Sequence, residues 1–437
     1  MDIVVRNATV VTMNERREVF TGDVAIEGST IAAVGAVAVR GRREIDAEGC
    51  ALLPGLVQAH VHLCQTLFRN VADGMPLLDW LRFWILPLEA LHDERSMRAS
   101  VRLGIAELLR GGTTCVLDMG SVHHTEVVFS ELEALGLRAT SGKAMMDCRD
   151  EIPPSLCEEL PAALEESLAL LRRWHCAADG RLRYAFAPRF ALSSSAELHR
   201  RVAEEARRHK VGVHSHAAEH RDEVARVGAM TGKGNVAYLH ELGLTGPHVC
   251  LAHCIWLDEE EMAILRQTGT HVLHCPTANL KLGSGVAKVP EMRGMGINVA
   301  LGSDGAACNN NLDAFIEMRL AALIQGPRLG AGALPAQAVV EMATLGGARA
   351  LGLADQIGSI EVGKKADLIL VDVHRPHNSP GHDIYGQIVF ACRSSDVRTV
   401  IIEGKIVVDE GRVLVVDEEE VVKRAEEESS RLLRKMR

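Results

Sequence analysis

Two histidines stand two residues apart in the segment Pro54-Gly55-Leu56-Val57-Gln58-Ala59-His60-Val61-His62. Successive side chains of a β-strand point to opposite faces, so His60 and His62 would lie on the same face of a strand. Two imidazoles placed in this way can hold one divalent metal ion. A His-x-His pair also occurs by chance in loops, and its position just after a Pro-Gly turn favours the metal-binding interpretation here.

Three further segments place reactive side chains after short apolar runs. In the segment 213–219, His216 could bind the same ion while Glu219, three residues later, reaches the same water. His253 and Asp304 each follow another apolar run. Each signal alone is weak, because a buried histidine is usually a hydrogen-bonded core residue and Asp-Gly is usually a turn. Together, these groups at successive strand ends indicate one shared site, and their nitrogen and oxygen atoms suit Zn²⁺ or Fe²⁺.

The elements that must position these groups alternate between apolar strands and amphipathic helices, from residue 54 to residue 355. The predicted strands include 114–117, 183–187, 211–214, 249–252, 270–274 and 298–301. The predicted helices include 96–110, 195–209 and 258–267. Strand–helix alternation implies an α/β fold with a parallel sheet. About 300 residues of this kind favour a TIM (β/α)₈ barrel, whose active site lies at the carboxyl ends of its strands.

Both ends of the chain instead consist of short strands rich in β-branched residues and separated by turns. These strands are predicted at 3–11, 23–27, 30–34 and 43–46, and again at 367–373, 397–403 and 405–409. We therefore expect residues 1–53 and 356–437 to form one small β-sandwich domain beside a catalytic barrel of residues 54–355. The charged stretch 418–437 should form a surface helix of that composite domain.

The composition excludes several classes of function. The 437 residues carry 48 Lys+Arg against 58 Asp+Glu, a formal net charge of -10, which disfavours a nucleic-acid polymer as partner. No apolar run approaches the ~18 residues of a membrane span, and no signal peptide is evident. The 11 cysteines lack paired spacing, which fits a reducing compartment. We expect a cytoplasmic homo-oligomer that acts on a small molecule.

Together these motifs resemble the amidohydrolase superfamily, specifically its mononuclear aminohydrolase branch, over essentially the whole chain. The segment Ile360–Asp367 is similar to the family's C-terminal β domain. Binuclear relatives carry a carboxylated lysine at the end of the fourth strand, where this chain has Arg189, so one divalent ion is expected, Zn²⁺ before Fe²⁺. The resemblance implies that this ion is held by His60, His62, His216 and Asp304.

The same resemblance implies that Glu219, His253 and Asp304 are catalytic. Asp304 would accept a proton from the attacking water, and Glu219 would carry a proton to the ring nitrogen beside the attacked carbon. His253 would orient the nucleophile and stabilise the tetrahedral intermediate, after which ammonia leaves.

The predicted pocket resembles two branches of the family. Gln65, Trp80 and Arg189 lie in segments similar to guanine deaminases, in which the residues corresponding to Gln65 and Arg189 bind the base. Glu89, in Leu86-Pro87-Leu88-Glu89, resembles the glutamate that meets the ribose hydroxyls in methylthioadenosine/S-adenosylhomocysteine deaminases. Trp80 either lines this pocket or packs in the core. Over its full length the chain most resembles 5′-deoxyadenosine deaminases.

At two positions this chain differs from S-adenosylhomocysteine deaminases, and both differences concern substrate binding. S-adenosylhomocysteine deaminases use an arginine for the amino-acid carboxylate where this chain has Lys143, and a histidine against the base where it has Arg189. A short 5′ substituent therefore fits the substrate-binding set better than an amino-acid tail.

The prediction that follows is a metal-dependent deaminase of an adenosine-type nucleoside, namely 5′-deoxyadenosine, methylthioadenosine, S-adenosylhomocysteine or adenosine. It would release ammonia and the inosine analogue. The alternatives are a guanine deaminase and a hydrolase of another amino- or chloro-substituted ring, such as an s-triazine. A non-catalytic assembly protein is disfavoured, because all six metal-binding and catalytic positions are present.

Overall fold

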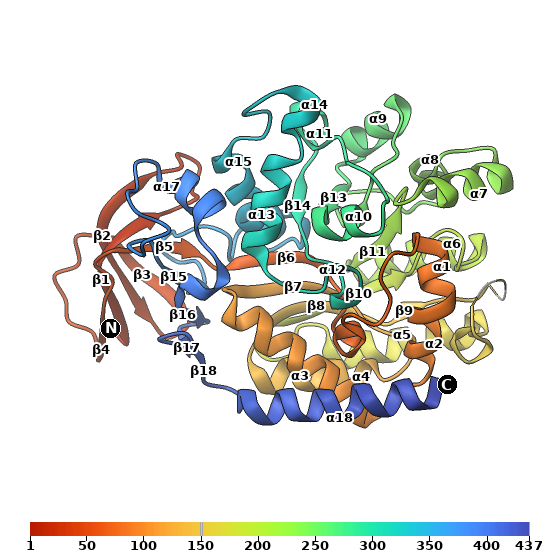
Figure 1. The fold of residues 1–437 in the computed structure, drawn as a ribbon, viewed down its shortest axis with the longest axis horizontal. Helices are drawn as coiled ribbons and strands as arrows, with labels where there is room; N and C mark the ends of the chain where they lie inside the picture. Colours follow the sequence, from red (N-terminus) through yellow and green to blue (C-terminus); the bar gives the residue numbers. More distant parts are fainter. Residues whose placement is uncertain (149, 151, 437) are drawn as a thin grey trace.

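The protein is described by a computed structural model, which covers residues 1–148, 150 and 152–436. At its centre, eight parallel strands of the described chain follow one another in sequence order (Figure 1). These strands are β6 (Leu56–Val61), β7 (Thr113–Met119), β8 (Arg138–Gly142), β10 (Leu182–Pro188), β11 (Gly212–Ala217), β12 (Val249–His253), β13 (His271–His274) and β14 (Val299–Leu301). A parallel bridge between Val61 and Asp304 joins the last strand to the first. The predicted TIM barrel is therefore confirmed.

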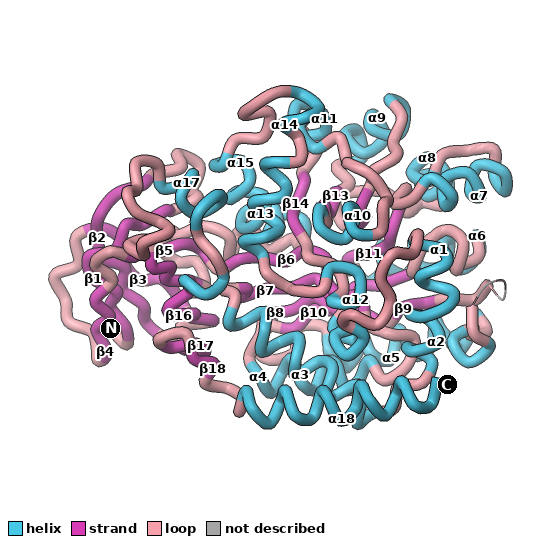
Figure 2. The backbone as a smooth tube through the Cα atoms, viewed as in Figure 1, coloured by secondary structure: helices cyan, strands magenta, loops and turns pink. Residues whose placement is uncertain are grey.

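Helices surround these strands, as Figure 2 shows. The main ones are α3 (Glu94–Arg110), α4 (Thr125–Leu135), α5 (Leu160–Trp174), α6 (Ala196–His209), α7 (Arg221–Thr231), α8 (Asn235–Glu241), α9 (Glu259–Thr268), α11 (Val289–Gly294) and α13 (Ala314–Leu323). Helix α6 starts where the Ser195 hydroxyl accepts from the Leu198 amide, and α9 starts at a capping box of Asp258 and Glu261. These caps explain why the predicted helix starts lie within a residue or two of the observed ones.

Short elements complete the barrel. On its carboxyl side lie η1 (Leu63–Phe68), α1 (Leu77–Trp80), η2 (Leu81–Ile85), α2 (Leu86–Ala90), β9 (Ala144–Met145), α10 (Pro276–Lys281) and α12 (Ala306–Asn309). The connection from the barrel back to the terminal sheet contains α14 (Gly326–Leu329), α15 (Ala336–Glu341), η4 (Met342–Gly346) and α16 (Gly347–Ala350).

Strands from both ends of the chain form a second sheet, at the left of Figure 1. Its strands are β1 (Ile3–Val11), β2 (Val19–Glu27), β3 (Thr30–Gly35), β4 (Arg43–Asp46), β5 (Cys50–Pro54), β15 (Leu368–Asp372), β16 (Val397–Ile402), β17 (Lys405–Asp409) and β18 (Arg412–Val413). The antiparallel pairing of β15 with β5 joins the two segments. Alternate side chains such as Val5, Ile26 and Leu370 form a core of their own, as expected for the small sandwich domain.

The C-terminal helix α18 (Glu418–Met436) runs along α3 of the barrel, at the bottom of Figure 1. Its face at Val421, Ala425 and Leu432 is buried, while most of its remaining side chains reach solvent. Sequence analysis placed this helix on the surface of the composite β domain, whereas it packs on the barrel because its apolar stripe matches α3. Arg437, the last residue of the predicted helix, lies outside the described residues. Within the described chain, no helix is long and apolar enough to cross a membrane.

Candidate active site

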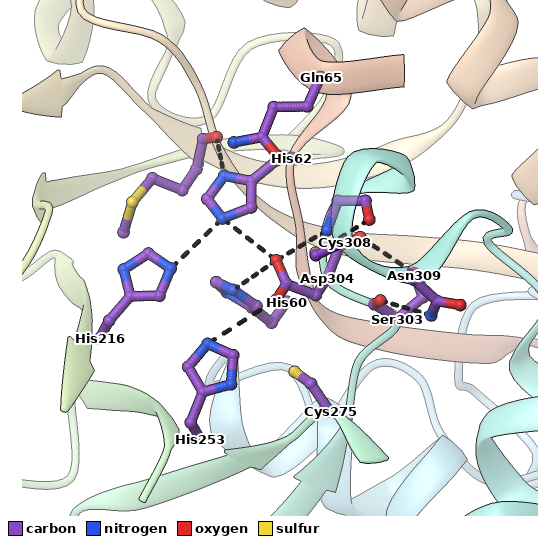
Figure 3. A network of polar contacts seen from close by, with 12 residues as sticks. His60, His62, Gln65, His216, His253, Cys275, Ser303, Asp304, Cys308 and Asn309 are labelled. Atoms are coloured by element: carbon purple, nitrogen blue, oxygen red, sulfur yellow. Dashed lines mark hydrogen bonds and ion pairs between the residues drawn. The ribbon is translucent and has the colours of Figure 1, made fainter. Parts of the chain in front are cut away.

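Four imidazoles and one carboxylate meet at the carboxyl ends of the barrel strands (Figure 3). Asp304 Oδ1 lies 3.4 Å from Nε2 of both His60 and His62. The Nε2 atoms of His62 and His216 are 3.3 Å apart, and Nε2 of His253 lies 3.8 Å from Asp304 Oδ2. His60 comes from β6, His216 from β11, His253 from β12 and Asp304 from the end of β14, so the closed barrel brings distant parts of the sequence together.

The other ring nitrogen of each histidine is held by the protein. Nδ1 of His62 lies 2.9 Å from the carbonyl of Met119, and Nδ1 of His216 lies 2.8 Å from the carbonyl of Arg189. Because a carbonyl only accepts, these contacts leave Nε2 of both rings with a free lone pair. Outer hydrogen bonds of this kind fix the orientation and tautomer of metal-binding imidazoles.

His60 and His253 are anchored by side chains that sequence analysis did not single out. Nδ1 of His60 lies 2.7 Å from Nε2 of His214, and Nδ1 of His253 lies 2.8 Å from Oδ1 of Asn279. Nε2 of both His60 and His253 is buried without a hydrogen-bond partner in the described chain. Buried polar atoms normally have partners. These convergent nitrogens with Asp304 therefore fit one divalent ion, as three overlapping groups of possible ligands indicate.

The backbone turns sharply where β12 and β14 end. His253 and Asp304 have φ angles of 72° and 63°, a left-handed conformation that non-glycine residues seldom adopt outside constrained sites. The Asp304 carboxylate accepts from the Gly305 amide at 2.7 Å, which supports this turn. Gly302 lets β14 approach β6, since a Cβ there would lie 2.7 Å from backbone atoms of His60. The strand ends thus direct both side chains toward the same point.

Burial sets the protonation of the histidines. It lowers the pKa of His60 to about 4, and it also lowers the pKa of His216 and His253. Burial alone would raise the pKa of Asp304, but the adjacent imidazoles of His60, His253 and His62 hold it well below its ordinary value. Neutral imidazoles and an ionised carboxylate are the forms that bind a metal ion.

Glu219 lies beside this cluster, and its pKa is shifted in the direction opposite to that of Asp304. Burial, followed by the charges of Asp304 and Glu223, raises the pKa of its carboxyl well above the ordinary value. Its Oε2 lies 3.4 Å from Nε2 of His253, and its Oε1 has no hydrogen-bond partner among the described residues. Glu223 accepts from the Glu219 amide at 2.8 Å and so fixes the loop. The pKa values of the two neighbouring carboxyls are thus shifted in opposite directions, down for Asp304 and up for Glu219.

A cavity adjoins the cluster, with about 420 Å³ of empty space when open solvent at its mouth is included. Its wall includes three of the predicted substrate-binding residues, Gln65, Trp80 and Arg189. Trp80 is nearly buried and its Nε1 has no hydrogen-bond partner in the described chain, so it both packs in the core and lines the cavity. The remaining wall is largely apolar, from Leu77, Leu81, Phe190 and Leu282. Such a wall suits a flat heterocycle whose polar edge meets a few fixed groups.

Glu89 lies behind this wall and is not among its lining residues. Its carboxylate receives two hydrogen bonds from Arg189, at 2.7 and 3.0 Å, and one from Gln65 at 2.9 Å. All three side chains are buried. Arg189 counteracts the effect of burial and lowers the pKa of Glu89. In this structure Glu89 positions the two polar groups of the wall.

The structure does not bring Lys143 to the cavity. Its ammonium is fully buried and donates to Glu158 at 2.6 Å and to Glu166. These bonds fasten the loop after β8 to α5. The side chains that could hold a metal and move a proton are thus assembled as the sequence motifs indicated, while Lys143 lies in a separate ion network.

His214 and Asn279 are the site residues that sequence reasoning missed. His214 stands two residues before His216 on β11, so the same two-residue period that links His60 and His62 could have found it. Asn279 lies in α10 after β13, and its approach to His253 depends on how two adjacent strand ends meet. No local sequence signal identifies that contact.

Comparison with known proteins agrees with this geometry. The model of the amidohydrolase family matches residues 51–407. A 5-methylthioadenosine/S-adenosylhomocysteine deaminase of Syntrophobacter fumaroxidans is 40% identical over 97% of this chain and 96% of that protein. A 5′-deoxyadenosine deaminase of Methanosarcina acetivorans is 39% identical, with the same coverage of 97% and 96%.

A solved structure of an adenosine deaminase from Xanthomonas campestris with bound zinc superposes with a TM-score of 0.94. It is 33% identical, and the match covers 99% of each chain. Both the sequence match and the fold therefore extend over the barrel and the terminal sheet together. The chain belongs to the amidohydrolase family and is a hydrolytic deaminase that acts on C–N bonds.

Proposed function

We propose that this enzyme is a metal-dependent deaminase of adenosine-type nucleosides, with 5′-deoxyadenosine or methylthioadenosine as substrate. One observation carries the proposal: Oε2 of Glu219 and Oδ2 of Asp304 lie 3.4 and 3.8 Å from Nε2 of His253, and the pKa is raised for Glu219 and lowered for Asp304. Hydrolytic deamination needs both a base for water and an acid for the ring. The names of relatives about 40% identical over nearly the whole chain support the nucleoside as substrate.

His60, His62, His216 and Asp304 would hold the ion, and we propose Zn²⁺ rather than Fe²⁺. A divalent ion in such a site lowers the pKa of water to about 7 and so makes hydroxide available at neutral pH. Zn²⁺ is also the ion in the Xanthomonas campestris structure.

The residues then act in order on an amino-substituted ring. Asp304 accepts the proton of the attacking water, and His253, whose Nδ1 donates to Asn279, orients that water by accepting from it at Nε2. Glu219 gives its proton to the ring nitrogen next to the attacked carbon, which makes that carbon electrophilic. Asp304 then passes the proton it took from water to the amino group, which leaves as ammonia. The new hydroxyl gives its proton to Glu219, which restores the acid, and the ring keeps a carbonyl.

The cavity wall supplies the binding contacts. Trp80 and Phe190 provide apolar surface for the purine, and Gln65 and Arg189 provide polar groups at its edge. The predicted contact of Glu89 with ribose hydroxyls remains part of the proposal. It requires the diol to share the carboxylate with Arg189, or to replace the bond from Gln65.

Guanine deamination is the second candidate, and the Arg189–Glu89 pair favours it. With Glu89 engaged, Gln65 and Arg189 form a fixed polar wall that could hold a free base without any ribose.

Ammonia release from a panel of substrates tests both candidates. The panel contains 5′-deoxyadenosine, methylthioadenosine, adenosine, S-adenosylhomocysteine, adenine and guanine. The proposal expects kcat/KM for 5′-deoxyadenosine at least tenfold above adenine, since each lost charge-assisted hydrogen bond is worth roughly 1.5–3 kcal/mol. Guanine faster than every nucleoside would refute the nucleoside assignment and support the second candidate.

A further inference from the structure

A second cavity opens at the opposite end of the barrel, where β10, β11 and β12 begin. It contains about 720 Å³ of empty space, including open solvent. Arg183 and Gly212, near the starts of β10 and β11, line it. The same two strands lead to Arg189 and His216 at the catalytic end. We call this space the floor cavity; Gly212 helps to keep it open because it has no side chain.

The floor cavity is lined by positive and neutral side chains. Arg183, Lys210, His175 and His248 are among its lining residues, and no Asp or Glu is. Arg183 donates from Nη1 to the Gly352 carbonyl at 3.4 Å, a long hydrogen bond, and its Nε is buried without a partner. No carboxylate in the described chain pairs with Arg183 or Lys210. Lys210 is exposed and Arg183 is partly buried, whereas the fully buried Arg138 is paired with Asp367.

Neutral hydrogen-bonding groups lie around the same space. Thr140 is only 7% exposed, and its hydroxyl has no hydrogen-bond partner in the described chain. Nε2 of half-buried His248 also lacks a hydrogen-bond partner there. Nδ1 of His175 accepts from the Tyr184 amide at 3.2 Å, so the neutral ring carries its proton on Nε2. These unused groups sit beside two cations that lack a counter-ion. Their combination indicates an anion as the missing partner.

We propose that the floor cavity binds the phosphate group of a small molecule. The double negative charge of phosphate matches Arg183 and Lys210, and its oxygens can accept from Thr140 and from the two imidazoles. Leu117, Pro247 and Leu351 add apolar surface for the attached organic part. The site lies on the far side of a layer of small side chains, including Ala185 and Cys250, and does not depend on the proposed deaminase substrate.

Titration calorimetry of inorganic phosphate into the full-length chain, at constant ionic strength, tests this proposal. Arg183→Gln and Lys210→Asn should each weaken phosphate binding by about tenfold, because each removes a charge-assisted hydrogen bond. Asn suits position 210, where the backbone is left-handed with a φ of 55°. Thr140→Val should weaken binding about threefold. Arg412→Gln, at an exposed position of the terminal sheet, is the matched control and should change nothing.

Acetate forms the second arm of the experiment and should bind at least tenfold more weakly than phosphate. Acetate that binds as well as phosphate would overturn the phosphate assignment. The site itself is refuted if phosphate up to about 10 mM gives no binding, or if its affinity is the same in all three variants. Lys210→Asn changes an exposed side chain, so it keeps the test decisive if Arg183→Gln does not fold. All variants should keep wild-type deaminase kcat in phosphate-free buffer.

Discussion

At the carboxyl ends of the barrel strands Arg189 is paired with Glu89 and Asp304 lies among histidines, whereas Arg183 and Lys210 at the amino ends face no carboxylate of the described chain. Arg183 lies in β10 and Arg189 directly follows its end, six positions later. Their side chains are chemically identical. What separates them is the set of neighbours that the barrel supplies at each end of the strand.

The two ends therefore prepare for different partners. At the catalytic end, outer hydrogen bonds fix the imidazole rings and Glu89 fixes Arg189 before substrate arrives, which lowers the reorganisation needed during reaction. At the floor cavity Nε of Arg183, the Thr140 hydroxyl and Nε2 of His248 remain without partners in the described chain, which costs stability but leaves them available to a ligand. Variants at the catalytic end should thus change activity, metal binding or stability, and variants at the floor cavity should change phosphate binding.

Removal of the metal should have the largest effect. Dialysis against a chelator should reduce ammonia release to background, and added Zn²⁺ should restore it, because water at neutral pH is a poor nucleophile without the ion. Phosphate binding in the floor cavity should persist in the metal-free protein. Full activity at less than about 0.1 metal ion per chain would contradict the proposed mechanism.

Glu89→Ala should lower the free energy of unfolding by about 3–5 kcal/mol, because it leaves the buried guanidinium of Arg189 without its partner. Urea unfolding followed by circular dichroism measures this change. The double variant Glu89→Ala/Arg189→Met should recover part of the loss, since it removes the unpaired charge as well. Equal stability of the single and double variants would show that the pair does not act as a unit.

Glu219→Gln should lower kcat by about 10²-fold or more while metal content stays unchanged, since an amide cannot carry the proton. Rates of ammonia release and elemental analysis of the same sample measure the two effects. Glu197→Gln, at an exposed position of α6, is the matched control. A variant that keeps activity within a few-fold of wild type would require another acid.

His214→Gln should weaken metal binding by about 10–100-fold, the usual cost of losing an outer hydrogen bond to a ligand. Its ring orients His60 from below the site without reaching the ion. At saturating Zn²⁺ the variant should regain most of the wild-type kcat, which separates a positioning role from a catalytic one. Competition with a zinc-binding dye gives the affinity.

Arg183→Met should change the free energy of unfolding the least, and it should raise it, whereas Glu89→Ala lowers it. Removal of an unpaired, half-buried cation should raise the free energy of unfolding by about 1 kcal/mol in phosphate-free buffer. Added phosphate should stabilise the wild type and not the variant, which the urea midpoint would show. Destabilisation of Arg183→Met without phosphate would mean that the guanidinium contributes to folding through contacts other than its bond to Gly352.

Much of the fold could be predicted from the sequence because its signals are local. Apolar strands alternate with capped amphipathic helices, and the predicted strand 3–11 coincides with β1. The strand predicted at 23–27 begins earlier, at Val19, because residues 19–21 pair with β1 although the side chains of Val19 and Thr21 are exposed. Pairing across the sheet determines where this strand begins, and the local pattern of residues does not indicate that pairing.

For the site, the histidines and Asp304 followed from strand ends that meet in a closed barrel. The residues that pair with Glu89 and Lys143 could not be predicted in this way. Arg189 lies 100 positions after Glu89, and only the folded chain shows that their charges meet behind the cavity wall. Lys143 ends an apolar strand, as expected of a pocket residue, but acidic side chains that follow it in sequence bind its ammonium.

The packing of α18 has a consequence for synthesis of the enzyme. Leu432 belongs to the same apolar cluster as Leu77 and Trp80 of the cavity wall, and the Ser429 hydroxyl donates to the Leu67 carbonyl at 2.8 Å. A nascent chain grows from its N-terminus, so this wall lacks its outer support until the final helix has left the ribosome. Ribosome-bound chains that stop before residue 418 should therefore fold their strands and helices yet release ammonia slowly.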